Sequence, residues 1–128
     1  MENKDIGKMA ETRIRNLIKD ENIVKESSKK PYDIKTKDNE IIEIKGFAKN
    51  PFDTGFFYLT ENERKQLKEA QKYSLYLVYN LENKPTNPDI IKLSREKILN
   101  LIEKQETKYY YLINKRTFKI LEKFKICP

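Results

Sequence analysis

The chain has 128 residues, of which 37% are charged and 38% hydrophobic, and this balance predicts one folded domain with a small core. It contains no histidine and a single cysteine, Cys127, which excludes imidazole-based catalysis, Ser-His triads and an internal disulfide. The formal net charge of +7 favours a polyanionic partner such as nucleic acid, although a lysine-rich composition alone could produce the same charge.

The sequence carries no pattern typical of membrane insertion or export. No apolar stretch approaches the roughly 20 residues that a membrane span needs, and residues 1–5 lack the apolar core of a signal peptide. A lone cysteine near the C-terminus is typical of a reducing compartment. We therefore expect a cytoplasmic protein.

Residues 5–20 are predicted to form the first helix, because apolar side chains recur there at helical spacing. The stripe consists of Ile6, Met9, Ala10, Ile14, Leu17 and Ile18. Glu11 lies at its edge, beside the small Gly7. Residues 23–26 are then expected to form a short strand, followed by a polar loop.

Residues 32–36 and 41–46 are predicted to be the two arms of a β-hairpin. Asp33 lies on the first arm and Glu43 on the second. The two side chains can share a face only if the loop has an odd number of residues, such as three, or if a β-bulge intervenes. A two-residue turn would place Asp33 on the wrong face, since side chains alternate along a strand.

Later segments complete an α/β pattern. Thr60 and Glu63 form a predicted capping box for a helix that runs to about residue 72, and we interpret Glu63 as a helix cap rather than a catalytic group. The remaining predicted strands cover residues 56–59, 73–80, 89–93 and 109–113, with a second helix at 94–105. Residues 73–80 are apolar on both faces, as in a central strand. We expect a mixed central sheet flanked by helices.

The second hairpin arm carries the residues that suggest a chemical function. Glu43 and Lys45 point to one face, while Ile42 and Ile44 point to the other and can pack into a core. With Asp33 on the neighbouring arm, two carboxylates and an ammonium group would lie side by side. This combination suits a hard divalent cation and an activated water. The alternative is an ordinary solvated strand face.

A magnesium or manganese ion is therefore the expected cofactor. The carboxylates of Asp33 and Glu43, with the backbone carbonyl of Ile44, are its expected ligands. Lys45 would orient or help to deprotonate the attacking water and stabilise the developing negative charge. Glu11 could reach the site from the first helix and hold a second ion.

These residues resemble the core of a known group of enzymes. Glu11, Asp33 and the triplet Glu43-Ile44-Lys45 are similar to the signature of the PD-(D/E)XK nuclease superfamily, which includes many restriction endonucleases and archaeal Holliday-junction resolvases. The resemblance implies a restriction-endonuclease-like αβββαβ core and metal-dependent hydrolysis of phosphodiester bonds.

A longer stretch, residues 7–81, resembles the domain at the C-terminus of the plant protein NO VEIN. Related domains occur in prokaryotic restriction and defence proteins. Tyr32 separates Pro31 from Asp33, which departs from the superfamily signature but is usual for this subfamily. The matching segments are Tyr32-Asp33-Ile34, Glu43-Ile44-Lys45-Gly46, Leu59-Thr60-Glu61-Asn62-Glu63 and Tyr73-Ser74-Leu75-Tyr76-Leu77-Val78. Residues 82–128 would then be a C-terminal extension of a single domain.

The function expected from the sequence is a Mg²⁺-dependent DNA endonuclease, acting in restriction, in defence or in a mobile element. A Holliday-junction resolvase-like nuclease, which would act as a homodimer, is one alternative. Others are a nuclease-like module that binds nucleic acid without cutting it, and a plain interaction domain. A partner subunit could supply specificity. Lysines that flank the site are candidates for phosphate contacts, or plain solvated surface: Lys29, Lys30, Lys35, Lys37 and Lys49.

Overall fold

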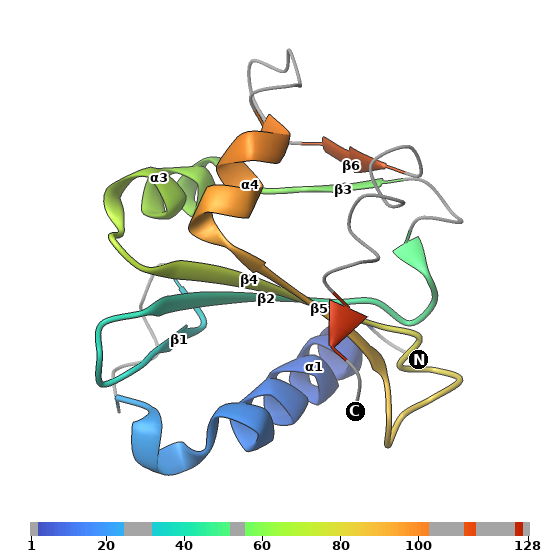
Figure 1. Cartoon of the computed structure of the whole chain (residues 1–128). Helices are drawn as coiled ribbons and strands as arrows, with labels where there is room; N and C mark the ends of the chain where they lie inside the picture. The colour runs from blue at the N-terminus through green and yellow to red at the C-terminus, as the bar shows by residue number, and fades with distance from the viewer. Residues whose placement is uncertain (1–2, 25–31, 52–55, 103–111, 115–124, 127–128) are drawn as a thin grey trace.

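A five-stranded mixed sheet flanked by helices forms the centre of the computed structural model, which describes residues 3–24, 32–51, 56–102, 112–114 and 125–126 (Figure 1). Across the sheet the strands follow the order β1 (Ile34–Lys35), β2 (Ile41–Gly46), β4 (Tyr73–Tyr79), β5 (Asp89–Ser94) and β7 (Lys125–Ile126). Only β2 and β4 are parallel among these neighbours, and the other pairs are antiparallel. The predicted α/β class with a mixed sheet is confirmed.

Helices cover both faces of this sheet. Helix α1 (Asn3–Ile18) lies on one face, whereas α3 (Glu61–Glu69) and α4 (Arg95–Ile102) lie on the other (Figure 1). A short 3₁₀ helix, η1 (Asp20–Asn22), follows α1. None of the helices that the structure describes has the length and apolarity needed to cross a membrane.

The face covered by α1 carries the even-numbered residues of the strands, because side chains alternate along a strand. Its buried cluster combines residues of α1, of four strands, of the bridge at Ile23 and of the segment after β4: Ile6, Ala10, Ile14, Ile23, Ile34, Ile42, Tyr76, Val78, Leu81 and Ile90. Leu17, which the helical spacing includes in the apolar stripe, is 46% exposed and lies outside that cluster.

The odd-numbered face packs against α3 and α4. Leu75 and Leu77 of β4 are fully buried there with Leu67 of α3 and Ile98 of α4. Every residue of β4 is buried, as expected for a strand covered on both faces. This face also carries Glu43 and Lys45 of β2, so these two catalytic candidates lie on the side of α3 and away from α1.

Thr36 and Glu40 extend the pairing of β1 with β2 by one residue each, which leaves a three-residue loop, 37–39, at the tip of the hairpin. Thr36 N donates to Glu40 O at 3.0 Å and closes the loop. Asn39 has φ of 67°, a left-handed conformation that asparagine tolerates better than most residues. The loop therefore has the odd length needed to place Asp33 and Glu43 on one face.

Two strands differ from the sequence-based expectation. In the predicted strand 23–26, Ile23 forms a single bridge with Thr36, and residues 25–31 lie outside the described part. The third strand, β3 (Phe56–Tyr58), pairs with β6 (Leu112–Asn114) in a separate two-stranded sheet. It cannot join β2 because β1 and β4 occupy both hydrogen-bonding edges of that strand. The predicted order αβββαβ is nonetheless present.

Strand β7, which the sequence did not predict, is tied to the sheet through buried Asp89. The carboxylate of Asp89 lies 2.7 Å from Lys125 Nζ and 3.0 Å from Lys84 Nζ. It also accepts from Asn80 Nδ2 at 2.6 Å. Burial would raise the pKa of Asp89, but these three partners outweigh burial and lower it to about 2. The C-terminal strand is therefore held by charge as well as by backbone pairing.

Gly46, at the end of β2, allows α1 to approach the sheet closely. A Cβ atom added there would lie 2.7 Å from Ala10 Cβ and 3.1 Å from Ile6 O. We expect Gly46→Ala to lower the free energy of unfolding by about 1–3 kcal/mol through overpacking. Gly7→Ala, whose Cβ meets nothing within 4 Å, should instead raise it by up to about 1 kcal/mol because alanine favours helix. Urea denaturation of both variants measures the difference, and equal stabilities would contradict it.

Candidate functional site

The carboxyl group of Asp33 meets that of Glu43 at the start of the hairpin. The paired register of β1 and β2 ends with Ile34 opposite Ile42, and Asp33 directly precedes it. The side chains of Asp33 and Glu43 are hydrogen-bonded to each other. Asp33 N donates to Ile42 O at 3.2 Å, and Asp33 Oδ2 accepts from Ile44 N at 2.7 Å. Backbone and side chain of Asp33 are thus both anchored to β2, which orients the carboxylate next to Glu43.

Lys45 shares that face and is held by a residue of α3. Its Nζ lies 2.8 Å from Oε1 of Glu63. The same oxygen accepts from Thr60 N at 2.8 Å, while Thr60 Oγ1 accepts from Glu63 N at 3.2 Å. The predicted capping box is confirmed. It does more than begin the helix, because it fixes Glu63 where that carboxylate binds Lys45.

Glu43 is buried among other carboxyl groups. It is 8% exposed, and burial, a hydrogen bond with Glu63 and the proximity of Asp33 raise its pKa to about 11. Burial also acts to raise the pKa of Glu63, but hydrogen bonds from Glu43, Lys45 and Thr60 N outweigh that effect and lower it. Three carboxyl groups therefore meet one ammonium group, and a proton on Glu43 offsets part of the excess negative charge.

Tyr73, at the start of β4, completes this cluster. Its side chain is 3% exposed, and its hydroxyl has no hydrogen-bond partner in the described part of the chain. Burial and the neighbouring carboxyl groups of Glu43, Glu63 and Asp33 raise the pKa of the phenol, so the hydroxyl stays protonated. An unpaired buried hydroxyl next to carboxylates costs stability.

Tyr73→Phe is therefore expected to stabilise the protein by about 1–3 kcal/mol, because it removes a buried donor that no group accepts. Thermal or urea unfolding measures the change. Tyr76→Phe is the matched control on the same strand, since the Tyr76 hydroxyl is hydrogen-bonded to Lys92. If Tyr73→Phe loses as much stability as the control Tyr76→Phe, or more, the prediction is contradicted.

Glu11 is not brought into the cluster. It accepts hydrogen bonds from Arg15 Nε and Nη2 at 3.2 and 3.1 Å, along α1. That helix packs on the face of the sheet opposite Glu43. The carboxyl group that approaches Glu43 from a helix is instead that of Glu63.

The structure describes three of the five lysines that flank the site in the sequence. Lys35 is on β1 on the same face as Asp33, Lys37 is in the hairpin loop, and Lys49 follows the end of β2. Lys37 and Lys49 are exposed. Lys29 and Lys30 lie outside the described residues.

Sequence reasoning did not assign Glu63 and Tyr73 to the site. Glu63 was visible as the N3 residue of a capping box and as part of the segment that resembles the NO VEIN domain. Tyr73 showed no signal beyond its place on an apolar strand. Both reach the site through tertiary contacts: α3 packs on the odd-numbered face of the sheet, and β4 pairs with β2 so that Tyr73 lies on that same face.

The donor set suits a cation held by two carboxylates. In the described part of the chain, no group of three or more Asp, Glu, His or Cys side chains has the arrangement to hold a metal ion. Magnesium does not require one, because it is commonly bound through one or two carboxylates with waters and substrate phosphates. Asp33 and Glu43 are oxygen donors of that kind, and the raised pKa of Glu43 indicates that a positive charge would be favoured there.

Comparison with known protein families identifies a match that covers most of the chain. The model of the family described as Protein NO VEIN, C-terminal, matches residues 3–93 of the chain. The matched range contains α1, the hairpin, α3 and β4, and it therefore includes all the residues of the cluster. No curated protein and no solved structure matches the chain.

Proposed function

The chain belongs to the family of the NO VEIN C-terminal domain, and we propose that it is a metal-dependent endonuclease of the PD-(D/E)XK type that hydrolyses phosphodiester bonds in DNA. The observation that carries this proposal is the juxtaposition of Asp33, Glu43 and Lys45 on one face of the hairpin. A solvated strand face would leave these side chains exposed, whereas Glu43 is 8% exposed and Lys45 is bonded to Glu63. Buried titratable groups whose pKa values are shifted by burial and by each other are typical of functional sites.

Asp33, Glu43 and the backbone carbonyl of Ile44 would hold the ion. When bound, Mg²⁺ or Mn²⁺ supplies positive charge for the phosphate in the transition state and acidifies a water. Glu43 would have to lose its proton for this to occur, so binding and deprotonation are coupled.

Lys45 provides a positioned donor beside the two carboxylates. An ammonium group has three N–H bonds, and one of these is used by Glu63 Oε1 at 2.8 Å. The other two N–H bonds can donate to the attacking water or to a phosphate oxygen. Since Glu63 holds the amine in place before substrate arrives, little reorganisation is needed as negative charge develops. Glu63 is in this sense a positioning residue.

A polyanionic substrate agrees with the charge of the chain. The net charge of +7 favours nucleic acid by counterion release. Lys37 and Lys49 are exposed near the two ends of β2, where they could contact phosphates on either side of the cluster.

Incubation of purified protein with supercoiled plasmid in Mg²⁺, Mn²⁺ or EDTA tests the proposal. We expect nicked and linear plasmid with either metal and none with EDTA. Asp33→Ala should slow nicking by at least about tenfold, because losing even an outer-shell partner of a metal ligand commonly costs that much.

Intact plasmid under every condition, with salt-sensitive DNA binding retained, would contradict the nuclease and favour the non-catalytic module. Unchanged nicking in Asp33→Ala would also contradict it, since the activity would then come from elsewhere. If the protein cuts a four-way junction faster than linear duplex, it is the resolvase-like nuclease. If it cuts RNA and not DNA, its substrate is RNA.

A further inference from the structure

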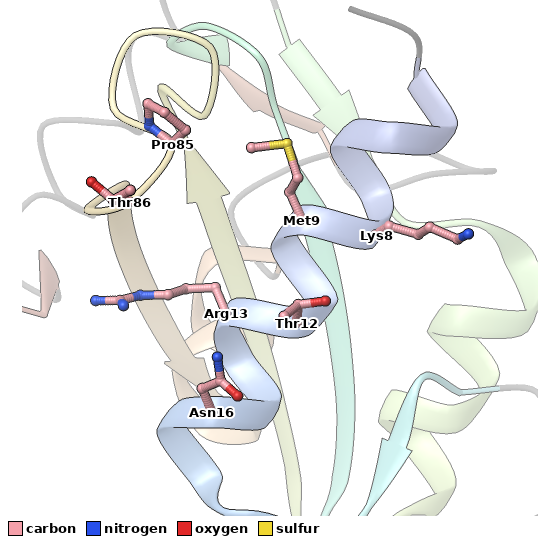
Figure 2. Close-up of a pocket in the computed structure, with 7 residues that line it drawn as sticks. All are labelled: Lys8, Met9, Thr12, Arg13, Asn16, Pro85 and Thr86. Atoms are coloured by element: carbon pink, nitrogen blue, oxygen red, sulfur yellow. The ribbon is translucent and has the colours of Figure 1, made fainter.

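A second polar feature lies on the other face of the sheet. A pocket of about 420 Å³ opens between α1 and the connection that joins β4 to β5 (Figure 2). It is lined by Lys8, Met9, Thr12, Arg13, Asn16, Pro85 and Thr86. None of these residues belongs to the carboxylate cluster, and α1 lies on the face of the sheet opposite to it.

The lining carries positive charge without a compensating acid. Lys8 and Arg13 are its charged residues, and no Asp or Glu contributes to it. Arg13 Nε is buried and has no hydrogen-bond partner in the described part of the chain. Arg15, two residues along the same helix, is by contrast paired with Glu11 at 3.1 Å. A buried donor on a permanently charged group is costly when it is unpaired, so an absent acceptor is the simplest explanation.

We propose that this pocket binds a phosphate group carried by a nucleotide unit, with Arg13 as the principal donor. The planar guanidinium matches the oxygens of a phosphate, and its charge cannot be removed by deprotonation. In Figure 2 Arg13 extends from α1 toward the side on which Pro85 and Thr86 lie, and the Thr86 hydroxyl is a further polar group of the lining. Lys8 extends the other way and contributes positive potential at a distance.

The size of the pocket favours a ligand larger than a free phosphate ion. A volume of about 420 Å³ lies in the range of small-molecule sites. Met9 and Pro85 add an apolar part to the lining, against which a sugar or base can pack. The shared chemistry is thus a phosphate attached to a nucleoside. Its source is either a free nucleotide or one unit of a nucleic-acid strand.

The test compares Arg13→Gln with Arg15→Gln in the full chain. The two variants lose the same charge from the same helix, but only Arg13 lines the pocket. Binding is followed by NMR through the side-chain Nε–H signal of Arg13 and by titration calorimetry in EDTA, so cleavage has no part in the readout. The probes are inorganic phosphate, a 5′-mononucleotide and a 12-nucleotide single strand.

We expect the mononucleotide, the strand or both to shift the Arg13 Nε–H signal. Arg13→Gln should weaken the binding by about tenfold or more, as for loss of a charge-assisted hydrogen bond, and Arg15→Gln by less than about twofold. Binding of the mononucleotide with the same affinity as the strand identifies a free nucleotide, and tighter binding of the strand identifies nucleic acid.

Equal weakening in the two variants would overturn the proposal, because the interaction would then be general charge attraction. An unshifted Arg13 signal with every probe would overturn it as well. Neither result depends on whether the protein cuts DNA, so this inference and the proposed nuclease function can fail separately.

Discussion

Lys45→Met is expected to lower the rate of Mg²⁺-dependent plasmid nicking by about 10²–10³-fold. Removal of one preorganised donor from a site of developing negative charge commonly has an effect of that size. Methionine preserves most of the length of the side chain, so packing on β2 is largely retained while the bond to Glu63 Oε1 is lost. Initial rates on supercoiled plasmid, at saturating and at low DNA concentration, measure the loss.

The matched control is Lys72→Met. Lys72 is also paired with a carboxylate, Asp38, at 3.4 Å, but its side chain is 58% exposed, whereas that of Lys45 is 23% exposed. Both variants lose one positive charge, so a general effect on DNA binding should be equal in the two. If Lys45→Met weakens DNA binding only as much as Lys72→Met does, and leaves the nicking rate at saturating DNA unchanged, then Lys45 is only a phosphate contact.

Glu43→Gln is expected to remove both the activity and an unusual pH dependence of stability. The pKa of Glu43 is about 11 in the folded protein and about 4.5 in the unfolded chain, so the folded state holds an additional proton between those values. The stabilisation is fully present below pH 4.5 and is lost as the pH rises toward 11. The metal-free protein should therefore lose stability from pH 5 to pH 8, by at most about 1.4 kcal/mol per pH unit.

The glutamine variant cannot ionise at this position and should show almost no slope in that window. The chain has no histidine, and the lowered pKa values of Glu63 and Asp89 place their titrations below it. Urea unfolding in EDTA at pH 5, 6, 7 and 8 measures the slope. Glu69→Gln, at an exposed position of α3, is the control and should follow the unmodified protein. A wild-type slope equal to that of Glu43→Gln would contradict the buried neutral carboxyl group.

Metal addition gives the complementary result. A ligand that binds only the folded state stabilises it by about 2.7 kcal/mol at 100 times its dissociation constant. Mg²⁺ should therefore stabilise the unmodified protein at pH 8, where its proton on Glu43 is most easily displaced, and have little effect on Glu43→Gln. An equal increase in both proteins would place the ion elsewhere.

Local sequence patterns predicted the elements whose own residues show a characteristic spacing or capping motif. Alternation of Glu43 and Lys45 with apolar neighbours predicted both β2 and its two faces. The Thr60–Glu63 capping box predicted where α3 begins. The two arms of the hairpin were predicted as well, while the length of its loop, which decides the face of Asp33, was left open. These features depend on contacts between residues that are close in the chain, so a single sequence contains them.

The α/β class and the hairpin could be predicted from the sequence, together with the condition that an odd-length loop or a β-bulge must bring Asp33 to the face of Glu43. Packing between distant elements selects the helix that supplies the additional carboxylate: Glu63 of α3 joins the cluster, while Glu11 of α1 pairs with Arg15. It also decided that β3 leaves the central sheet and that the Tyr73 hydroxyl is buried without a partner. The physical reason is that both helices are amphipathic, and periodicity shows which side of a helix is buried but not which face of the sheet will cover it.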